Sequence, residues 1–351
     1  FAGPLGTGPG AGAYVAVTFL ATATAFAFFQ VPYVAMPAEL TGDYQERTRL
    51  MGWRVAVLAL AILVSGAVAP LVVSAGGEGI AGYRWMGLFV ATLIVLGALG
   101  AFFGTRSAPT GTVAESEPSL RAQLAVAAGN RPFRLLLTTL VIQSAGIATI
   151  LAGVNYFADQ ILRDPETGPT LLFVSFIGPA LLVMPLWTRL GVRVGKLRSY
   201  VWSSLILAVA AAGLVAGGAL PPVAVYLLMA VGGAGFAGQQ AFALAMLPDC
   251  IAYDTARTGR RQAGVFTGVW TAGETFGLAL GPGVYGLVLQ LTGYVSSTGT
   301  AAVQPDSARL GVLVGFSVLP AVLIGAALVL LRGYDLTPER LASVTTPTPT
   351  P

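Results

Sequence analysis

Histidine is absent from the 351 residues of the sequence, cysteine occurs once, and charged residues make up only 10% of the chain. Without histidine there can be no serine–histidine catalytic triad, no histidine metal site and no imidazole proton relay. The lone Cys250 excludes an intramolecular disulfide and a cysteine-cluster metal site. Soluble domains carry about 25% charged residues, so this chain has too little charge to cover a surface that faces water.

Long apolar segments take the place of the missing charge. Hydrophobic residues make up 55% of the chain, and its mean hydropathy is +0.78. About 20 consecutive apolar residues span a bilayer as a helix, the conformation that satisfies its own backbone hydrogen bonds in lipid. The sequence therefore predicts an all-helical, multi-pass membrane protein with nine such segments, at residues 13–36, 53–73, 85–104, 135–157, 170–188, 199–219, 222–247, 264–291 and 310–331.

The lysines and arginines lie almost entirely on one side of the predicted membrane. Sixteen of the 19 fall in alternate connections, and the other three are Arg84, Arg163 and Arg309. Because basic loops stay in the cytoplasm, we expect a cytoplasmic C-terminus and an external start of the chain. That start has neither an initiator methionine nor a signal-peptide pattern, which favours a fragment without its first helices. Scattered basic residues also do not form the continuous face that binds nucleic acid.

The longest and most polar connection divides the chain at residues 105–133, and we expect a short helix in it at Ser119–Ala128. Three apolar segments precede this connection and six follow. With three further helices in front, the plan is two six-helix bundles with a substrate site between them, as in the major facilitator superfamily. The predicted domains are the rest of the N-terminal bundle (helices 4–6) at 1–104, the linker at 105–133, the C-terminal bundle (helices 7–12) at 134–332 and a disordered cytoplasmic tail at 333–351.

Two connecting segments carry recognisable sequences. One is PYVAMPAELTGDYQERTR, at residues 32–49, and the other is LPDCIAYDTARTGRRQAG, at residues 247–264. Both resemble signatures of the glycoside–pentoside–hexuronide:cation symporter family, and residues 130–134 and Gly195-Lys196 are weaker matches. The resemblance implies a major facilitator fold and makes the first segment here the fourth helix of the family.

The resemblance also implies a cytoplasmic gate. In the family, ion pairs at this end join the two bundles and close the inner entrance, and the matching residues are Arg47, Asp249 and Arg261. Pairs at a moving interface suit this role because they can break into water at small cost.

Polar side chains within the apolar segments are candidates for a substrate or cation site. The family's acidic residue in helix four corresponds to Gln30, and its lysine in helix eleven corresponds to Glu274. These departures leave the coupling ion open between H⁺ and Na⁺, and we expect no other cofactor and no bound metal. The remaining candidates are Arg54, Asn155, Tyr156, Gln240 and Trp270.

Glu274 is the one acidic residue in the middle of a predicted span. A charge there costs at least about 2.5–3.5 kcal/mol, so such a residue is usually functional and partnered. We expect it to carry a proton or to pair with a cationic group of the substrate, with Gln30 as a neutral partner. The alternative is a protonated structural glutamate. Nearby Gly273, Gly277 and Gly281 predict close helix packing or a sliding surface.

These observations predict a secondary active transporter, a symporter that moves a small organic solute across the plasma membrane by alternating access. The resemblance implies a sugar or glycoside as substrate. The alternatives are a lysolipid or another amphipathic solute, and a non-transporting sensor derived from a transporter. An enzyme is not expected, because the spans lack a convergent nucleophile, base or metal site. We expect a monomer whose partners are the solute and the bilayer.

Overall fold

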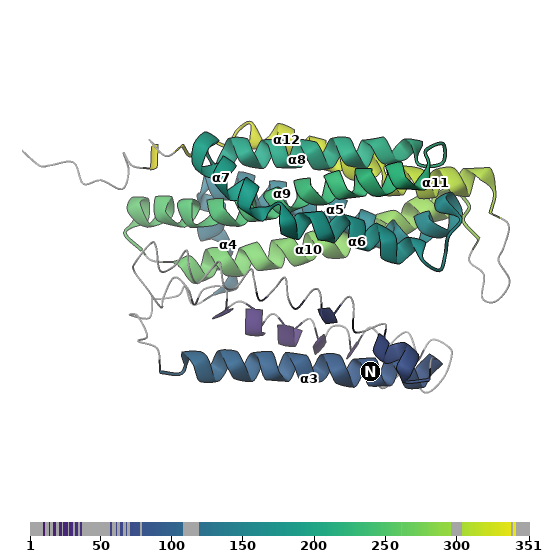
Figure 1. The fold of residues 1–351 in the computed structure, drawn as a ribbon. Coiled ribbons are helices and arrows are strands. Elements are labelled where there is room, and N and C mark those ends of the chain that lie inside the picture. Colours follow the sequence, from purple (N-terminus) through teal and green to yellow (C-terminus); the bar gives the residue numbers. More distant parts are fainter. Residues whose placement is uncertain are drawn as a thin grey trace, which may run out of the picture. The chain divides into compact units, whose positions relative to one another are not determined.

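The structure is a computed structural model that describes residues 71–77, 79–107, 119–260, 262–295, 304–337 and 340–341, with scattered positions between 10 and 68. The described residues contain helices and no strand. Contacts divide the chain into two compact units, unit 1 (Phe1–Ala114) and unit 2 (Glu115–Pro351), which are described separately (Figure 1).

Unit 1 contains one long described helix, α3 (Gly79–Thr105). This helix includes the span predicted at 85–104. The described positions between residues 14 and 36 are helical as well, but most of the spans predicted at 13–36 and 53–73 lie outside the described residues.

Unit 2 is a bundle of helices that run along one another (Figure 1). The largest packing interfaces join α8 to α9, α5 to α10, α6 to α9 and α5 to α12. The helices are α4 (Leu120–Gly129), α5 (Arg131–Phe157), α6 (Gly168–Leu182), α7 (Met184–Val194), α8 (Lys196–Gly213), α9 (Pro222–Thr258), α10 (Ala263–Leu291), α11 (Asp306–Phe316) and α12 (Val318–Leu331).

Five stretches of the described residues are long and apolar enough to cross a membrane, and the bent pair α6–α7 makes a sixth. The five are Ile80–Thr105, Arg131–Leu162, Lys196–Ala216, Pro222–Thr258 and Asp306–Leu331. Helix α10 has 29 residues, about 43 Å of helix, and lies where a span was predicted. It is not one of these five stretches.

The predicted span at 170–188 is strongly bent. The segment expected at 170–188 is divided at Val183, and α7 turns away from α6 by 50°. Pro185 in the first turn of α7 has no amide hydrogen to donate to the preceding turn, so the α6 hydrogen-bond ladder stops there.

The short helix expected in the linker is confirmed as α4. Ser119 caps its start, accepting a hydrogen bond from the Ala122 amide at 3.2 Å. Asn130 ends α4 and caps α5, because its Oδ1 accepts from the Phe133 amide at 3.0 Å. The Asn130 side chain also donates to the Cys250 carbonyl oxygen at 2.9 Å, which ties this turn to α9.

Close packing at the glycines is confirmed as well. A Cβ on Gly277 would lie 2.5 Å from the Val141 carbonyl oxygen, and one on Gly281 would clash with Ala148. Helix α10 can therefore approach α5 backbone to backbone. On α9, a Cβ on Gly235 would lie 2.7 Å from the Leu207 amide nitrogen of α8. A sliding role for these surfaces stays a prediction.

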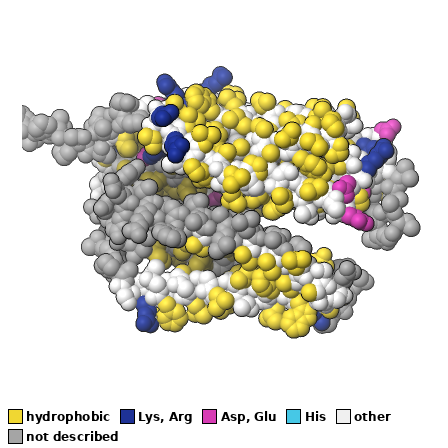
Figure 2. Space-filling view, viewed as in Figure 1, with side chains coloured by type: hydrophobic (Ala, Val, Ile, Leu, Met, Phe, Trp, Pro, Cys, Tyr) yellow, Lys and Arg dark blue, Asp and Glu magenta, His cyan; other side chains and the backbone are white. Residues whose placement is uncertain are grey.

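The sides of unit 2 are apolar. Figure 2 shows hydrophobic side chains along its length and charged side chains at its ends. Large residues such as Leu182, Leu186 and Val209 are exposed. Such a surface is unstable in water but suits contact with lipid.

Candidate functional site

Three of the predicted site residues, Arg47, Arg54 and Arg261, lie outside the described residues. Gln30 occupies a half-exposed helical position in unit 1. The expected Gln30–Glu274 pair joins the two units, so it stays a prediction.

Two predicted residues meet in unit 2. The Gln240 amide Nε2 of α9 donates to the Glu274 carboxylate Oε1 of α10 at 3.4 Å, and both side chains are half-buried. Glu274 lies eleven residues after the first residue of α10, about 17 Å along the helix. The polar pair therefore lies well along the length of the apolar helix, away from its first turns.

Gln239, the other polar residue expected to line the cavity, belongs to a buried network whose other members were not predicted as a site. Gln239 donates from Nε2 to the Gln143 Oε1 at 2.6 Å, and the Tyr200 hydroxyl donates to the same oxygen at 2.7 Å. Gln143 Nε2 in turn donates to the Ser204 hydroxyl oxygen at 3.1 Å. Gln143, Tyr200 and Ser204 are all 0% exposed. The network fixes α5, α8 and α9 relative to one another, and with them the direction of Gln240.

Trp270 lies one helical turn before Glu274 but does not face solvent. Its side chain is 3% exposed and belongs to a hydrophobic core with Phe133 and Phe266. These two phenylalanines are packed edge to face, with ring centroids 4.9 Å apart. Trp270 therefore supports the helix that carries Glu274.

Asn155 and Tyr156 lie at the far end of α5. Asn155 is exposed, and the Tyr156 ring packs on those of Tyr285 and Tyr294 at centroid distances of 5.7 and 5.3 Å. Gly277, close to Glu274, packs against Val141, and Tyr156 is 15 residues beyond Val141, about 22 Å along α5. Within unit 2, Asn155 and Tyr156 are therefore separate from the Gln240–Glu274 pair.

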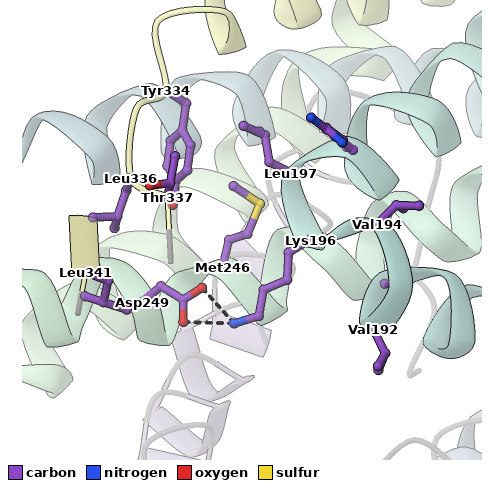
Figure 3. Close-up of a pocket in the computed structure, with 13 residues that line it drawn as sticks. Val192, Val194, Lys196, Leu197, Met246, Asp249, Tyr334, Leu336, Thr337 and Leu341 are labelled. Carbon is purple, nitrogen blue, oxygen red and sulfur yellow. Dashed lines mark hydrogen bonds and ion pairs between the residues drawn. The ribbon is translucent and has the colours of Figure 1, made fainter. Parts of the chain in front are cut away.

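The predicted gate residue Asp249 has a described partner in Lys196, the first residue of α8. Lys196 Nζ lies 2.8 and 2.7 Å from the two carboxylate oxygens of Asp249 (Figure 3). The two side chains are 43% and 28% exposed. A partly exposed ion pair contributes about 0–1 kcal/mol, so this pair can open at little cost.

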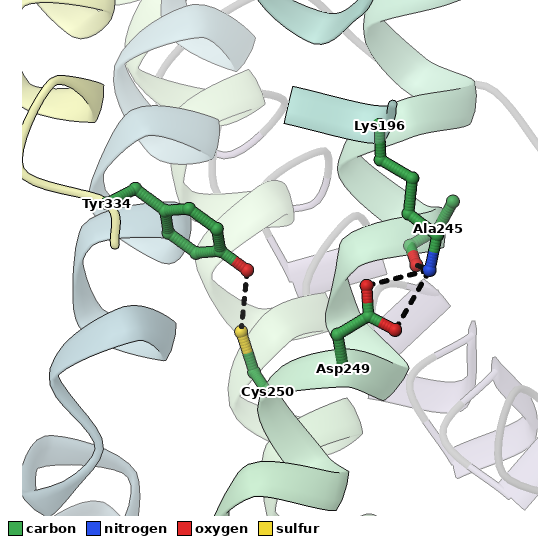
Figure 4. A network of polar contacts seen from close by, with 5 residues as sticks. All are labelled: Lys196, Ala245, Asp249, Cys250 and Tyr334. Carbon is green, nitrogen blue, oxygen red and sulfur yellow. Dashed lines mark hydrogen bonds and ion pairs between the residues drawn. The ribbon is translucent and has the colours of Figure 1, made fainter. Parts of the chain in front are cut away.

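The chain after α12 folds back against the same region. Tyr334 is buried, and its hydroxyl lies 3.6 Å from the Cys250 Sγ (Figure 4). Burial raises the pKa of this phenol above its ordinary value, so it remains protonated. Leu336 is buried too. The packed part of the chain thus extends past Arg332, where the disordered tail was expected to begin, because apolar side chains of this segment cover α9.

A comparison with known protein families identifies the family of the chain. The model of the MFS/sugar transport protein family matches residues 1–338. The chain is 26% identical to "Putative glycoside/cation symporter YagG" of Escherichia coli, over 94% of this chain and 71% of that protein.

Two further relatives are similar over the same extent. The "Uncharacterized symporter YnaJ" of Bacillus subtilis is 26% identical over 92% of this chain and 70% of its own length. The "Inner membrane symporter YicJ" of Escherichia coli is 24% identical over 94% of this chain and 71% of its own length.

A match over residues 1–338 covers nearly the whole chain and includes every predicted site residue. The protein is therefore a multi-pass membrane transporter and not an enzyme. The chain belongs to the MFS/sugar transport protein family of the major facilitator superfamily, which confirms the resemblance to the glycoside–pentoside–hexuronide:cation symporters.

Proposed function

We propose that the protein is a proton-coupled symporter for a glycoside-like small solute, with Glu274 as the coupling residue. The observation that carries this proposal is the contact between Gln240 and Glu274 inside the bundle. Two relatives support the solute class, since one is named "Putative glycoside/cation symporter YagG" and another "Glucuronide carrier protein homolog".

The chemistry of the pair supports a proton rather than Na⁺. A neutral amide can donate to a carboxyl oxygen in either protonation state, so Gln240 holds Glu274 in place while a proton arrives and leaves. The described residues contain no group of three or more acidic, cysteine or histidine side chains that could hold a metal ion, and Na⁺ needs several oxygen ligands. Uptake of a proton also removes a charge that is costly to bury.

Alternating access would use the Asp249 end of the molecule as its inner gate. We infer that Arg47 and Arg261 compete with Lys196 for the Asp249 carboxylate as the two bundles move. The exposed, low-cost Lys196–Asp249 pair is compatible with such an exchange. Under this proposal the α7–α8 and α9–α10 connections lie in the cytoplasm, in line with their arginines and the positive-inside rule.

The test is accumulation by proteoliposomes that contain the purified full-length protein. A pH gradient, acidic outside, is expected to drive uptake of one or more members of a panel of labelled glycosides and glucuronides. A Na⁺ gradient without a pH gradient should not drive it. Substrate exchange without accumulation would argue against coupling, and binding without any transport would favour the sensor. Uptake of a labelled lysolipid alone would replace the glycoside by the amphipathic alternative.

A further inference from the structure

Helix α7 is bent by 50° from α6 and has two different faces. On one face the Trp187 indole donates to the Ala234 carbonyl oxygen of α9 at 2.7 Å, and Gly191 is packed against the Phe242 ring. On the other face Leu186 and Val192 are 64% and 84% exposed. An amphipathic helix that is bent by 50° from its preceding span has the features of an element at the lipid–water interface.

Basic side chains are concentrated where α7 meets α8. Figure 2 shows dark blue side chains gathered at this end of unit 2, and all four cations are exposed. Within the part of the chain that the structure describes, Asp249 pairs with Lys196, and no carboxylate pairs with the arginines of this group. The four cations are Arg189, Arg193, Lys196 and Arg198.

A cavity of about 660 Å³ opens at this junction (Figure 3). Its charged lining is Lys196, Arg198 and the single acid Asp249, so it has an excess of positive charge. The rest of the lining is mostly apolar and comes from α7, α8, α9 and the chain after α12: Val192, Val194, Leu197, Met246, Tyr334, Leu336 and Leu341. Apolar walls with a cationic opening match an anion that carries a hydrocarbon part.

We propose that this cavity binds the headgroup of an anionic phospholipid. The phosphate lies against Arg198 and Lys196, the first methylene groups of the acyl chains lie between the apolar walls, and the chains continue along the exposed Leu186 and Val192. The volume is within the range of small-molecule sites. Arg193 stands next to the cavity and adds attraction within the Debye length, about 8–10 Å at ordinary salt. Basic pockets of this kind are known lipid sites in membrane proteins.

A lipid phosphate here would act on the ion pair next to it. Lys196 can donate three hydrogen bonds, and in this structure it uses them on the Asp249 carboxylate and on the Ala245 carbonyl oxygen, 3.1 Å away (Figure 4). A phosphate competes with Asp249 for this ammonium group, so bound lipid weakens the Lys196–Asp249 pair. Lipid composition would thereby bias the conformations of the α8–α9 end.

Native mass spectrometry of the full-length protein tests the proposal. The protein is titrated with phosphatidylglycerol or with phosphatidylcholine of the same chains. Phosphatidylglycerol is expected to bind at least tenfold more tightly, and Arg193→Gln with Arg198→Gln should remove most of that preference. The matched control is Arg163→Gln with Arg309→Gln, which removes two arginines from the opposite end and should change nothing. Helical content by circular dichroism checks that both variants fold.

Three results would overturn the proposal. One is equal affinity for the two lipids, and another is an unchanged preference in the Arg193→Gln, Arg198→Gln variant. The third is displacement of the lipid by millimolar glycerol phosphate alone, which would assign the site to a soluble anion. Binding to this site is independent of which solute is carried, so failure of transport would leave the lipid result intact.

Discussion

Gln240 and Glu274 face each other across α9 and α10, with amide nitrogen and carboxylate oxygen 3.4 Å apart. They are 34 residues apart in sequence, and each lies in the interior of a long helix. The contact gives Glu274 a neutral partner that does not force it to stay ionised. A neutral partner is compatible with the proposed role of Glu274 as the proton carrier.

Glu274→Gln should separate exchange from accumulation. The glutamine preserves size and hydrogen bonding but cannot bind and release a proton, so substrate exchange should continue while pH-driven accumulation falls to background. In the same proteoliposomes, counterflow measures substrate exchange and gradient-driven uptake measures accumulation. Gln290→Glu, on the exposed surface near the end of α10, is a control that should leave both unchanged. Accumulation with an unaltered pH dependence in Glu274→Gln would remove this residue from the coupling mechanism.

Asp249→Ala should loosen the α8–α9 end of the molecule. The alanine leaves Lys196 without its carboxylate, and because the pair contributes only about 0–1 kcal/mol, the effect should be a shift in conformation rather than unfolding. A Gln240→Cys reporter in a Cys250→Ser background measures it by labelling with a membrane-impermeant maleimide. We expect labelling from the cytoplasmic side to become several-fold faster.

Asp306→Ala is the matched control for this experiment, since Asp306 is an exposed acid at the start of α11. It should not alter the labelling rate. An equal rate in Asp249→Ala and the parent would show that Asp249 does not hold the gate.

Substitutions at different members of the buried network around Gln143 should lower the stability of the protein by different amounts. Gln143→Leu removes three hydrogen bonds and leaves the Tyr200 hydroxyl and the Gln239 amide without an acceptor. Hydrogen bonds between membrane helices average about 0.6 kcal/mol, with a maximum near 1.7. Gln143→Leu should therefore lower stability by about 2 kcal/mol, and Tyr200→Phe by about 0.6 kcal/mol.

Unfolding of the full-length protein in mixed micelles measures these differences. The double variant Gln143→Leu, Gln239→Leu should be less destabilised than the sum of its single changes, because it removes donor and acceptor together. Additive effects would mean that the two glutamines do not interact in the folded protein.

Helix positions and small-residue contacts could be predicted because they depend on local sequence. The apolar runs predicted α5, α8 and the α11–α12 stretch, and the glycine spacing indicated that α10 packs closely against a neighbouring helix, although not which one. The partner of Asp249 could not be predicted in the same way. Lys196 is 53 residues away, and its position depends on how α8 packs on α9.

The rotation of each helix about its own axis also could not be predicted, and this limited the prediction of the site. Gln239 and Gln240 are adjacent polar residues, and only packing decides that the first enters the Gln143 network and the second meets Glu274. The signal that could have identified the network is the presence of Gln143, Ser203 and Ser204 inside apolar segments. Such residues in lipid need partners, but the sequence does not say which ones.

Gly277→Ala tests whether α10 depends on direct backbone contact with α5. The added methyl group would lie 2.5 Å from the Val141 carbonyl oxygen and 2.8 Å from the Ser144 Cβ, and neither can move without shifting the helix. Overpacking of this kind costs about 1–3 kcal/mol, so the unfolding midpoint should fall clearly. Gly283→Ala, on the same helix with no atom within 4 Å of the new Cβ, should leave the midpoint unchanged or raise it slightly, since alanine is the better helix former.

Because Glu274 lies three residues before Gly277, the displaced helix should also weaken the contact with Gln240. Substrate exchange should therefore slow in Gly277→Ala while remaining normal in Gly283→Ala. Equal stability and equal exchange in the two variants would mean that the α5–α10 interface is looser than the glycine contacts indicate.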